Sequence, residues 1–172
     1  MSEFKFPTEE IELPSKGLIY PKDNPLSSGK VEIKYMTAKE EDILSNQSFI
    51  EKGIVLEKLL KSVIIDKNIN IDELIVGDKN ALLIATRILG YGSNYDISVK
   101  GQKYTLDMST LENKEIKDSD YTAGKNEFDF TTPSTNTILT YQLATGKLEK
   151  QIEREIAGLK KLNKEGSADL TT

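Results

Sequence analysis

Three parts of the sequence contain residues that could do chemistry at spacings found in functional sites. In DKNIN, Asp66, Asn68 and Asn70 occupy alternate positions, as oxygen ligands do in a calcium-binding loop. The sixth position is Ile71, where the tight turn needs glycine, and the twelfth is Gly77, where a bidentate glutamate belongs. The spacing therefore does not predict a calcium site.

The second part is GYGSNY, which begins like the glycine-rich loop that holds the phosphates of a dinucleotide. Such a loop follows a strand and carries a third glycine. Here it follows a stretch with helical periodicity, and Tyr95 stands at the position of the third glycine. We therefore expect no dinucleotide and no other cofactor.

The third part is a set of paired carboxylates, which could divide acid and base roles or bind a metal. The pairs are Glu40 with Glu41, Asp72 with Glu73, and Asp118 with Asp120. Each pair lies in a polar stretch or in the first turn of a predicted helix, where hydration or helix capping accounts for it. We therefore assign no catalytic residue and no metal ligand.

The composition narrows the possible chemistry further. The 172 residues include no histidine and no cysteine, which excludes Ser/His/Asp triads, thiol nucleophiles, disulfides and the usual zinc ligands. The formal net charge of -5 argues against general nucleic-acid binding, because phosphate contacts need a basic face. No apolar run reaches about 18 residues, and residues 1–10 lack the apolar region of a signal peptide. We expect a soluble, intracellular protein that is not an enzyme and binds neither nucleic acid nor membranes.

The N-terminal residues 1–28 are predicted to form an extended arm. Pro7, Pro14 and Pro21 each disfavour helix for themselves and for the preceding residue. Prolines also reduce the conformational entropy that the segment loses when it becomes ordered. The arm either covers the edge of its own core or binds a partner through apolar side chains: Leu13, Leu18, Ile19 and Tyr20.

Residues 29–143 are predicted to form a compact body. Alternating side chains predict a strand over residues 31–35, and Thr37 with Glu40 forms a capping box that opens a helix. Helical periodicity predicts a second helix over about residues 53–65 and a third over residues 79–89, capped by Asp78 and ending at Gly90. The third helix is apolar around most of its circumference, so we expect most of it to be buried.

The rest of the body is predicted to be strands and loops. A hairpin over residues 95–108 turns at Gly101, and two more strands lie in residues 127–133 and 137–143. Arg87 is a charged residue within the apolar third helix. Either its aliphatic part packs on the body while its guanidinium reaches solvent or pairs with a nearby carboxylate, or the guanidinium binds a partner. Arg87 and the nearby Tyr91 are therefore candidate partner-binding residues.

Residues 144–172 are predicted to form a long amphipathic helix and a tail. Its apolar side chains form one narrow stripe and the other positions are mostly charged, as in a coiled coil or a docking helix. The stripe either folds back onto the body or binds a partner, and the chain could also form homo-oligomers. The stripe residues are Leu148, Ile152, Ile156, Leu159 and Leu162, of which the first four are candidate partner-binding residues. The predicted class is α+β: about three core helices with antiparallel hairpins, an N-terminal arm and a C-terminal helix.

Several short blocks of the sequence, spread from Glu12 to Leu159, resemble the T-even-type bacteriophage baseplate hub assembly family. The blocks are LPSKGLIYP, MTAKEEDIL, IDELIVGDKNALLIATRILGYGSNYDI and LATGKLEKQIEREI. The central block, with Gly77-Asp78, Arg87 and Tyr91-Gly92, is the most specific of them.

The resemblance implies a virion morphogenesis role in the host cytoplasm, through contacts with other baseplate, hub or tail proteins of a contractile tail. The protein would act as an assembly chaperone that leaves or as a structural hub subunit that remains in the virion. Some relatives carry paired cysteines after the tyrosine block, and this chain has none in SVKGQKYTL, so the resemblance implies no metal here. The alternative function is a small carboxylate-dependent hydrolase or another phage accessory enzyme.

Overall fold

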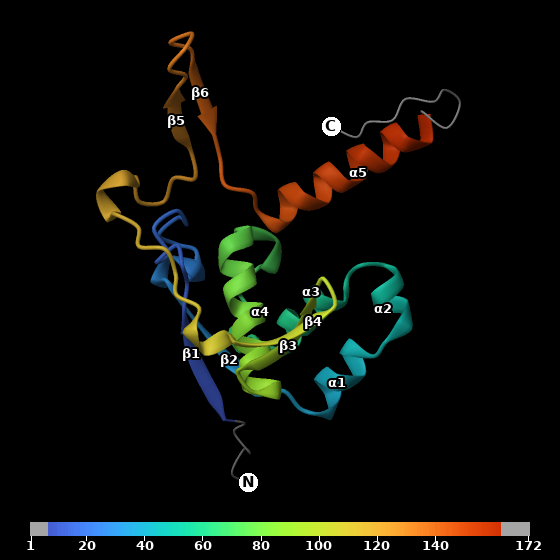
Figure 1. Ribbon diagram of the computed structural model, residues 1–172. Helices are drawn as coiled ribbons and strands as arrows, with labels where there is room; N and C mark the ends of the chain where they lie inside the picture. The colour runs from blue at the N-terminus through green and yellow to red at the C-terminus, as the bar shows by residue number, and fades with distance from the viewer. Residues whose placement is uncertain (1–6, 163–172) are drawn as a thin grey trace.

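The computed structural model describes residues 7–162 as a mixture of helices and antiparallel sheet, which confirms the predicted α+β class (Figure 1). The strands are β1 (Thr8–Glu12), β2 (Lys30–Lys34), β3 (Asn94–Val99), β4 (Gln102–Asp107), β5 (Phe128–Thr131) and β6 (Ile138–Tyr141). The α-helices are α1 (Ala38–Leu44), α2 (Gln47–Glu51), α3 (Val55–Val63), α4 (Val76–Tyr91) and α5 (Gly146–Leu162). Short 3₁₀ turns are η1 (Pro25–Ser28), η2 (Ile71–Glu73), η3 (Met108–Thr110) and η4 (Asp118–Asp120).

The strands form three separate two-stranded antiparallel sheets, β1–β2, β3–β4 and β5–β6. Only β1–β2 contributes side chains to the fully buried core. Val31 and Ile33 of β2 point into the core and alternate with solvent-facing Glu32, as the period of two requires. Ile33 also bridges to Ile64 at the end of α3, which joins this sheet to the helices.

The hydrophobic core lies between β2, the segment before it, α3, η2 and α4. Its fully buried large apolar side chains come from all of these elements, so no element could bury its apolar face alone. These side chains include Leu13, Leu26, Ile33, Leu60, Leu74 and Leu82. Among the described residues, every buried side-chain nitrogen or oxygen has a hydrogen-bond partner.

The described part of residues 1–28 belongs to the body and is not a separate arm. Residues 8–12 pair with β2, and Leu13, Ile19 and Tyr20 are buried in the core. Between them the chain turns tightly at Gly17, which has a φ of 76°. A Cβ at Gly17 would lie 2.6 Å from the backbone of Gly29. The prolines therefore shape a folded loop that packs on its own core, one of the two outcomes expected for this segment.

A buried carboxylate fastens this loop to the first turn of α4. The Asp78 side chain is fully buried and accepts hydrogen bonds from the Ser15 backbone N–H (3.0 Å), the Ser15 hydroxyl (2.6 Å) and the Tyr20 hydroxyl (2.6 Å). The Tyr20 oxygen in turn accepts from the N–H of Ile75 at 3.1 Å. Burial and the neighbouring Asp78 raise the pKa of Tyr20, so its hydroxyl remains a donor at any ordinary pH. We call Ser15, Tyr20 and Asp78 the clasp.

The third predicted helix differs from the structure in its bounds and in its burial. This helix, α4, begins at Val76 and not at Lys79, so Asp78 lies within its first turn instead of capping it. It continues to Tyr91, and the residue with positive φ after it is Gly92 and not Gly90. Leu82 is fully buried, whereas Leu83, Ala85, Ile88 and Leu89 are only half-buried.

The predicted capping box of α1 is present and is linked to a second buried carboxylate. Glu40 accepts hydrogen bonds from the backbone N–H (2.9 Å) and hydroxyl (2.6 Å) of Thr37, and it is fully buried. Lys34 of β2 donates to it at 2.8 Å, and Ser62 of α3 donates as well. Burial alone would raise the pKa of Glu40, but the hydrogen bonds from Lys34, Ser62 and Thr37 outweigh it and lower the pKa to about 2.

This lowered pKa predicts a loss of stability in acid. Because the folded-state pKa lies below the ordinary value of 4.5, the stabilisation is complete above about pH 4.5 and disappears as the pH falls towards about 2. The shift of the Glu40 pKa corresponds to about 3 kcal/mol of stability. Urea unfolding at about pH 6 and about pH 2 should therefore show wild type losing more stability than Glu40→Gln does.

The exposed Glu153→Gln provides the matched control and should follow wild type at both pH values. If wild type and Glu40→Gln lose stability equally on acidification, the buried carboxylate is not the group that responds.

Candidate protein-interaction surface

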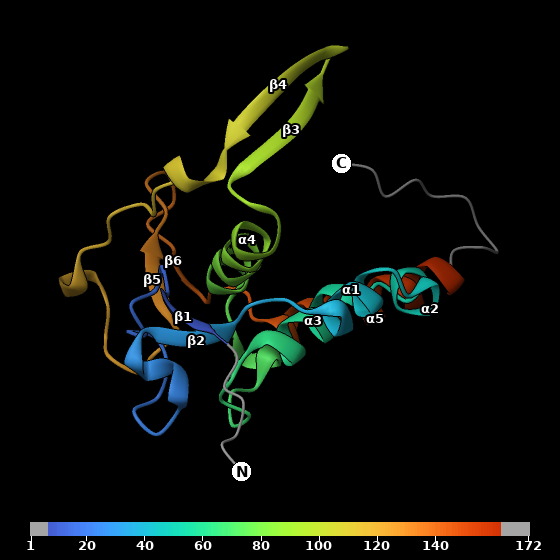
Figure 2. The same ribbon diagram turned by 90° about the horizontal axis from the view of Figure 1, so that it is seen from below.

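Three elements project from the body and carry apolar side chains into solvent. In Figure 1, α5 (red) and the hairpin β5–β6 (orange) extend away from the body in different directions. The hairpin β3–β4 (yellow-green) extends from the end of α4, as the rotated view in Figure 2 shows. We call these three elements the projections.

The hairpin β3–β4 is amphipathic and exposes its apolar face. Its register pairs Tyr95 with Leu106, Ile97 with Tyr104, and Val99 with Gln102, so one face collects the apolar side chains. The other face carries polar and charged side chains: Asp96, Ser98, Lys103 and Thr105. The larger apolar side chains are 38–50% exposed: Tyr95, Val99, Tyr104 and Leu106. An isolated two-stranded hairpin is marginally stable in water, so this face is suited to being covered.

Arg87 fixes the direction in which β3–β4 leaves α4. Its guanidinium donates to the backbone oxygens of Gly92 (3.1 Å) and Asn94 (3.4 Å). It also lies over the rings of Tyr91 (4.9 Å) and Tyr95 (5.6 Å), within range of a cation–π interaction. Among the described residues, the Arg87 guanidinium therefore contacts carbonyls and rings and no carboxylate.

Tyr91, the neighbouring candidate, is half-exposed and also has a partner within the chain. Its hydroxyl donates to Glu41 of α1 at 2.7 Å, and this hydrogen bond raises the pKa of Tyr91. Arg87 and Tyr91 therefore join α4 to its neighbours, and only the exposed part of the Tyr91 ring remains for a partner.

The hairpin β5–β6 repeats the pattern of β3–β4. Phe128 pairs with Tyr141 and Phe130 pairs with Leu139, so these four side chains share one face. Phe130, Leu139 and Tyr141 are 50–52% exposed, whereas Phe128 is half-buried against the core. On the other face Thr140 donates to Asp129 at 2.7 Å. This hairpin also offers an exposed apolar face.

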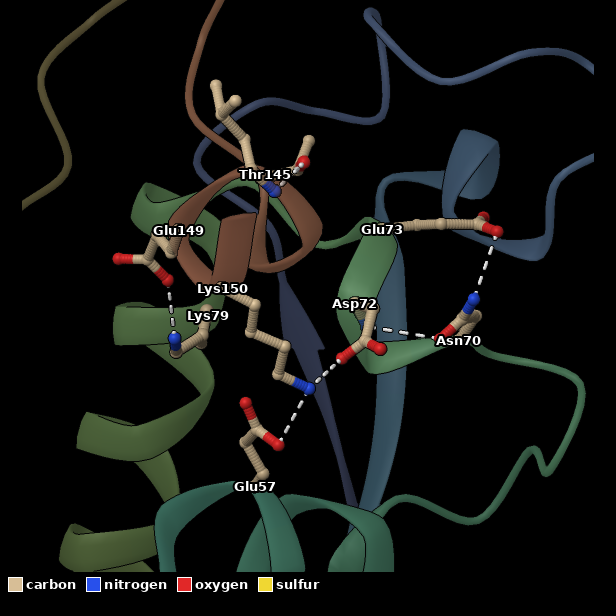
Figure 3. Close-up of polar contacts among 9 residues, drawn as sticks. Glu57, Asn70, Asp72, Glu73, Lys79, Thr145, Glu149 and Lys150 are labelled. Carbon is tan, nitrogen blue, oxygen red and sulfur yellow. Dashed lines mark hydrogen bonds and ion pairs between the residues drawn. The ribbon is translucent and has the colours of Figure 1, made fainter. Parts of the chain in front are cut away.

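Charged side chains anchor the first two turns of α5 to the body (Figure 3). Lys150 lies 2.7 Å from Asp72 of η2 and 2.9 Å from Glu57 of α3, and these hydrogen bonds raise the pKa of Lys150. Glu149 pairs with Lys79 of α4 at 2.7 Å. The buried Gly146 donates its N–H to the carbonyl of Leu74 at 3.0 Å. A Cβ at this position would lie 3.3 Å from the backbone of Asp72, so a larger residue would require that backbone to shift.

Beyond this anchor the side chains of α5 point into solvent. Every residue from Gln151 to Lys160 is exposed, including Ile152 (45%), Ile156 (45%) and Leu159 (51%). Leu148, the first stripe residue, is half-buried at the anchored end. The exposed stripe of Ile152, Ile156 and Leu159 is the feature that best fits a docking helix.

The N-terminal candidates are placed differently. Leu13, Ile19 and Tyr20 are at most 5% exposed and pack within their own core, and Leu18 is half-buried. In this structure the first three offer no surface to a partner. Sequence reasoning left these residues as candidates for a partner or for their own core, because their apolar character is the same in both cases.

Sequence reasoning did not identify the apolar faces of β3–β4 and β5–β6 as candidate partner sites. The signal was present in the alternation of apolar and polar residues. Alternation predicts one buried face, but it does not say whether that face meets the body or a partner.

The acidic pairs considered for catalysis all have structural partners in the fold. Glu40 and Glu41 bind side chains of neighbouring elements, Asp72 pairs with Lys150, and Asp118 pairs with Lys16 at 3.0 Å. In the part of the chain that the structure describes, no group of acidic side chains could hold a metal ion. The arrangement of these carboxylates supports local structure and pairing across elements.

Among the helices within residues 7–162, none combines the length and the apolar character needed to cross a bilayer. Comparisons with protein-family models, with curated proteins and with solved structures find no match to this chain.

Proposed function

We propose that this chain is a bacteriophage baseplate hub morphogenesis protein. It acts through protein–protein contacts in the host cytoplasm, as an assembly chaperone or as a structural subunit of a contractile tail, and it carries no catalytic centre. Two of the blocks that carry the family resemblance, LPSKGLIYP and the Gly77-Asp78 block, meet at the clasp. Their joint role in one buried contact supports reading them as parts of one fold.

The exposed stripe of α5 is the observation that carries the protein-binding proposal. The stripe lies on a helix whose base is held by two sets of ion pairs, so its position relative to the body is set before any partner arrives. About half of each side chain is exposed, so covering Ile152, Ile156 and Leu159 would contribute on the order of 2–4 kcal/mol. Pre-positioning lowers the entropy cost of docking.

The two versions of this function differ in what happens after assembly. A chaperone leaves and a subunit stays, so mass spectrometry of purified virions should find only a subunit in stoichiometric amounts. We favour the chaperone because an acidic, charge-rich surface with exposed docking elements suits reversible contacts.

Co-expression with the hub and tail proteins of the same phage tests the proposal. We expect one of them to co-purify with the wild-type chain and the double substitution Ile152→Glu and Ile156→Glu to reduce its recovery at least about tenfold. Both positions are exposed, so thermal unfolding should be unchanged within about 2 °C.

The matched control is Glu153→Gln with Arg154→Gln on the polar side of α5, which should bind as wild type does. A chain that remains alone under every pairing, or a partner that tolerates the two glutamates, would argue against α5 as the docking element.

A further inference from the structure

A cleft separates the hairpin β5–β6 from the irregular segment that precedes it. Its volume is ≈ 530 Å³, and its lining includes three aromatic rings and three carboxylates. These rings and carboxylates belong to Asp120, Tyr121, Glu127, Phe128, Asp129 and Tyr141. Of these carboxylates Asp129 belongs to the projection β5–β6, whereas Asp120 and Glu127 lie in the segment before it.

Contacts with the N-terminal loop hold one side of the cleft, and hydrogen bonds at the base of β5–β6 hold the other. On one side Lys16 pairs with Asp118 in η4 at 3.0 Å, and Gly124 donates its N–H to the carbonyl of Leu18 at 2.7 Å. On the other side the Asn126 side chain donates to the Leu143 carbonyl (3.0 Å) and accepts from the Leu143 N–H (2.9 Å). The cleft is therefore a formed feature of the fold.

The aromatic rings of the cleft form a connected cluster. Phe128 lies edge-on to Tyr121, with centroids 5.6 Å apart, and stacks with Tyr141 at 5.4 Å. Tyr121 and Phe128 pack against the core, whereas Tyr141 is 52% exposed. Aromatic faces attract cations, most often guanidinium groups, and the attraction increases when water is excluded.

The charges of the cleft also favour a cation. Asp120 and Glu127 contribute carboxylates, and among the described residues of the lining Lys125 is the one cation, 3.3 Å from Glu127. Asp120 otherwise accepts only from the neutral Ser119 hydroxyl (3.2 Å). Asp129 binds Thr140 on the face of β5–β6 opposite to Phe128 and Tyr141, so it adds negative charge at the edge of the cleft and does not lie beside the rings. The lining therefore carries an excess of negative charge beside exposed ring surface.

We propose that this cleft binds an arginine side chain carried by a basic segment of a partner protein. Arginine fits better than lysine because its planar group can stack on a ring while its N–H groups bind carboxylates. This inference rests on the proposed function in one respect, that the partner is a protein. It adds a charge-selective contact to the apolar contact of α5.

Peptide titration of the ¹⁵N-labelled full chain tests the proposal. The probe is an acetylated and amidated peptide, Gly-Arg-Gly-Arg-Gly, and the matched probe replaces both arginines with uncharged citrulline. We expect saturable chemical-shift changes of the backbone amides, confined to residues 118–129 and 139–143. The citrulline peptide should bind at least about fivefold more weakly than the arginine peptide. Tyr141→Leu and, separately, Asp120→Asn with Glu127→Gln should each weaken arginine binding by about fivefold.

Tyr104→Leu in β3–β4 is the control, because it removes an equally exposed tyrosine outside the cleft. It should leave binding unchanged, as should the α5 double variant, so this test can fail or succeed independently of docking through α5. The proposal is overturned if no saturable shifts occur, if citrulline binds equally well, or if Tyr141→Leu and Tyr104→Leu bind alike.

Discussion

We expect Asp78→Ala to lower the free energy of unfolding by about 3–5 kcal/mol. Asp78 is fully buried and accepts three hydrogen bonds, two from Ser15 and one from Tyr20. Alanine would leave these buried donors without an acceptor, and each unsatisfied group costs about 1–3 kcal/mol. The same change would release the N-terminal loop from α4, so part of the effect should appear as local opening.

Urea unfolding measures this effect, and hydrogen exchange locates it. Amides of residues 13–29 should lose protection first in Asp78→Ala. Tyr20→Phe removes one donor and keeps the ring, so we expect about 1–2 kcal/mol. The exposed Asp42→Ala in α1 is the control and should change stability by less than about 0.5 kcal/mol. A change of that small size in Asp78→Ala would mean that the clasp does not hold the loop.

We expect Leu82→Ala to lower the free energy of unfolding by about 2–5 kcal/mol. Leu82 is fully buried on the side of α4 that faces the core, among side chains from the N-terminal loop, β2, α3 and η2. Shortening it removes apolar contact and leaves a cavity that these elements can close only partly.

The adjacent Leu83 is the matched control for this prediction. It is half-buried at the margin of the core, so Leu83→Ala removes the same atoms from a less enclosed place and should cost less than half as much. Chemical denaturation of both variants gives the comparison. If Leu83→Ala proves the more destabilising of the two, α4 faces the core with a different side.

The elements predicted well are those whose signals lie within a few residues of one another. Thr37 and Glu40 are one helical turn apart, and the structure contains their capping box. Gly101 follows Lys100 in the turn of β3–β4, and both have positive φ values. In each case the interacting groups are close in the chain whatever the tertiary fold, so sequence spacing is enough to predict them.

Sequence spacing was not enough where an apolar or charged residue had to choose between distant partners. Residues 1–28 were expected to form an arm that covers its own core or binds a partner, and in the structure Leu13, Ile19 and Tyr20 complete the core. Asp78 was expected to cap a helix, but it binds Ser15, 63 residues earlier in the chain. A buried polar group needs a hydrogen-bond partner and an apolar side chain needs apolar contacts, but only the tertiary path of the chain decides which residues provide them.

By itself the sequence determined the mixture of helices and hairpins, the turns and caps that bound them, and the absence of histidine and cysteine chemistry. Only the tertiary structure decided that the N-terminal loop is part of the core, that Asp78 and Glu40 are buried, and that the faces of the two hairpins and the outer half of α5 are exposed. The physical reason is that local signals depend on backbone geometry over one or two turns, whereas burial depends on which distant surfaces compete for the same apolar faces.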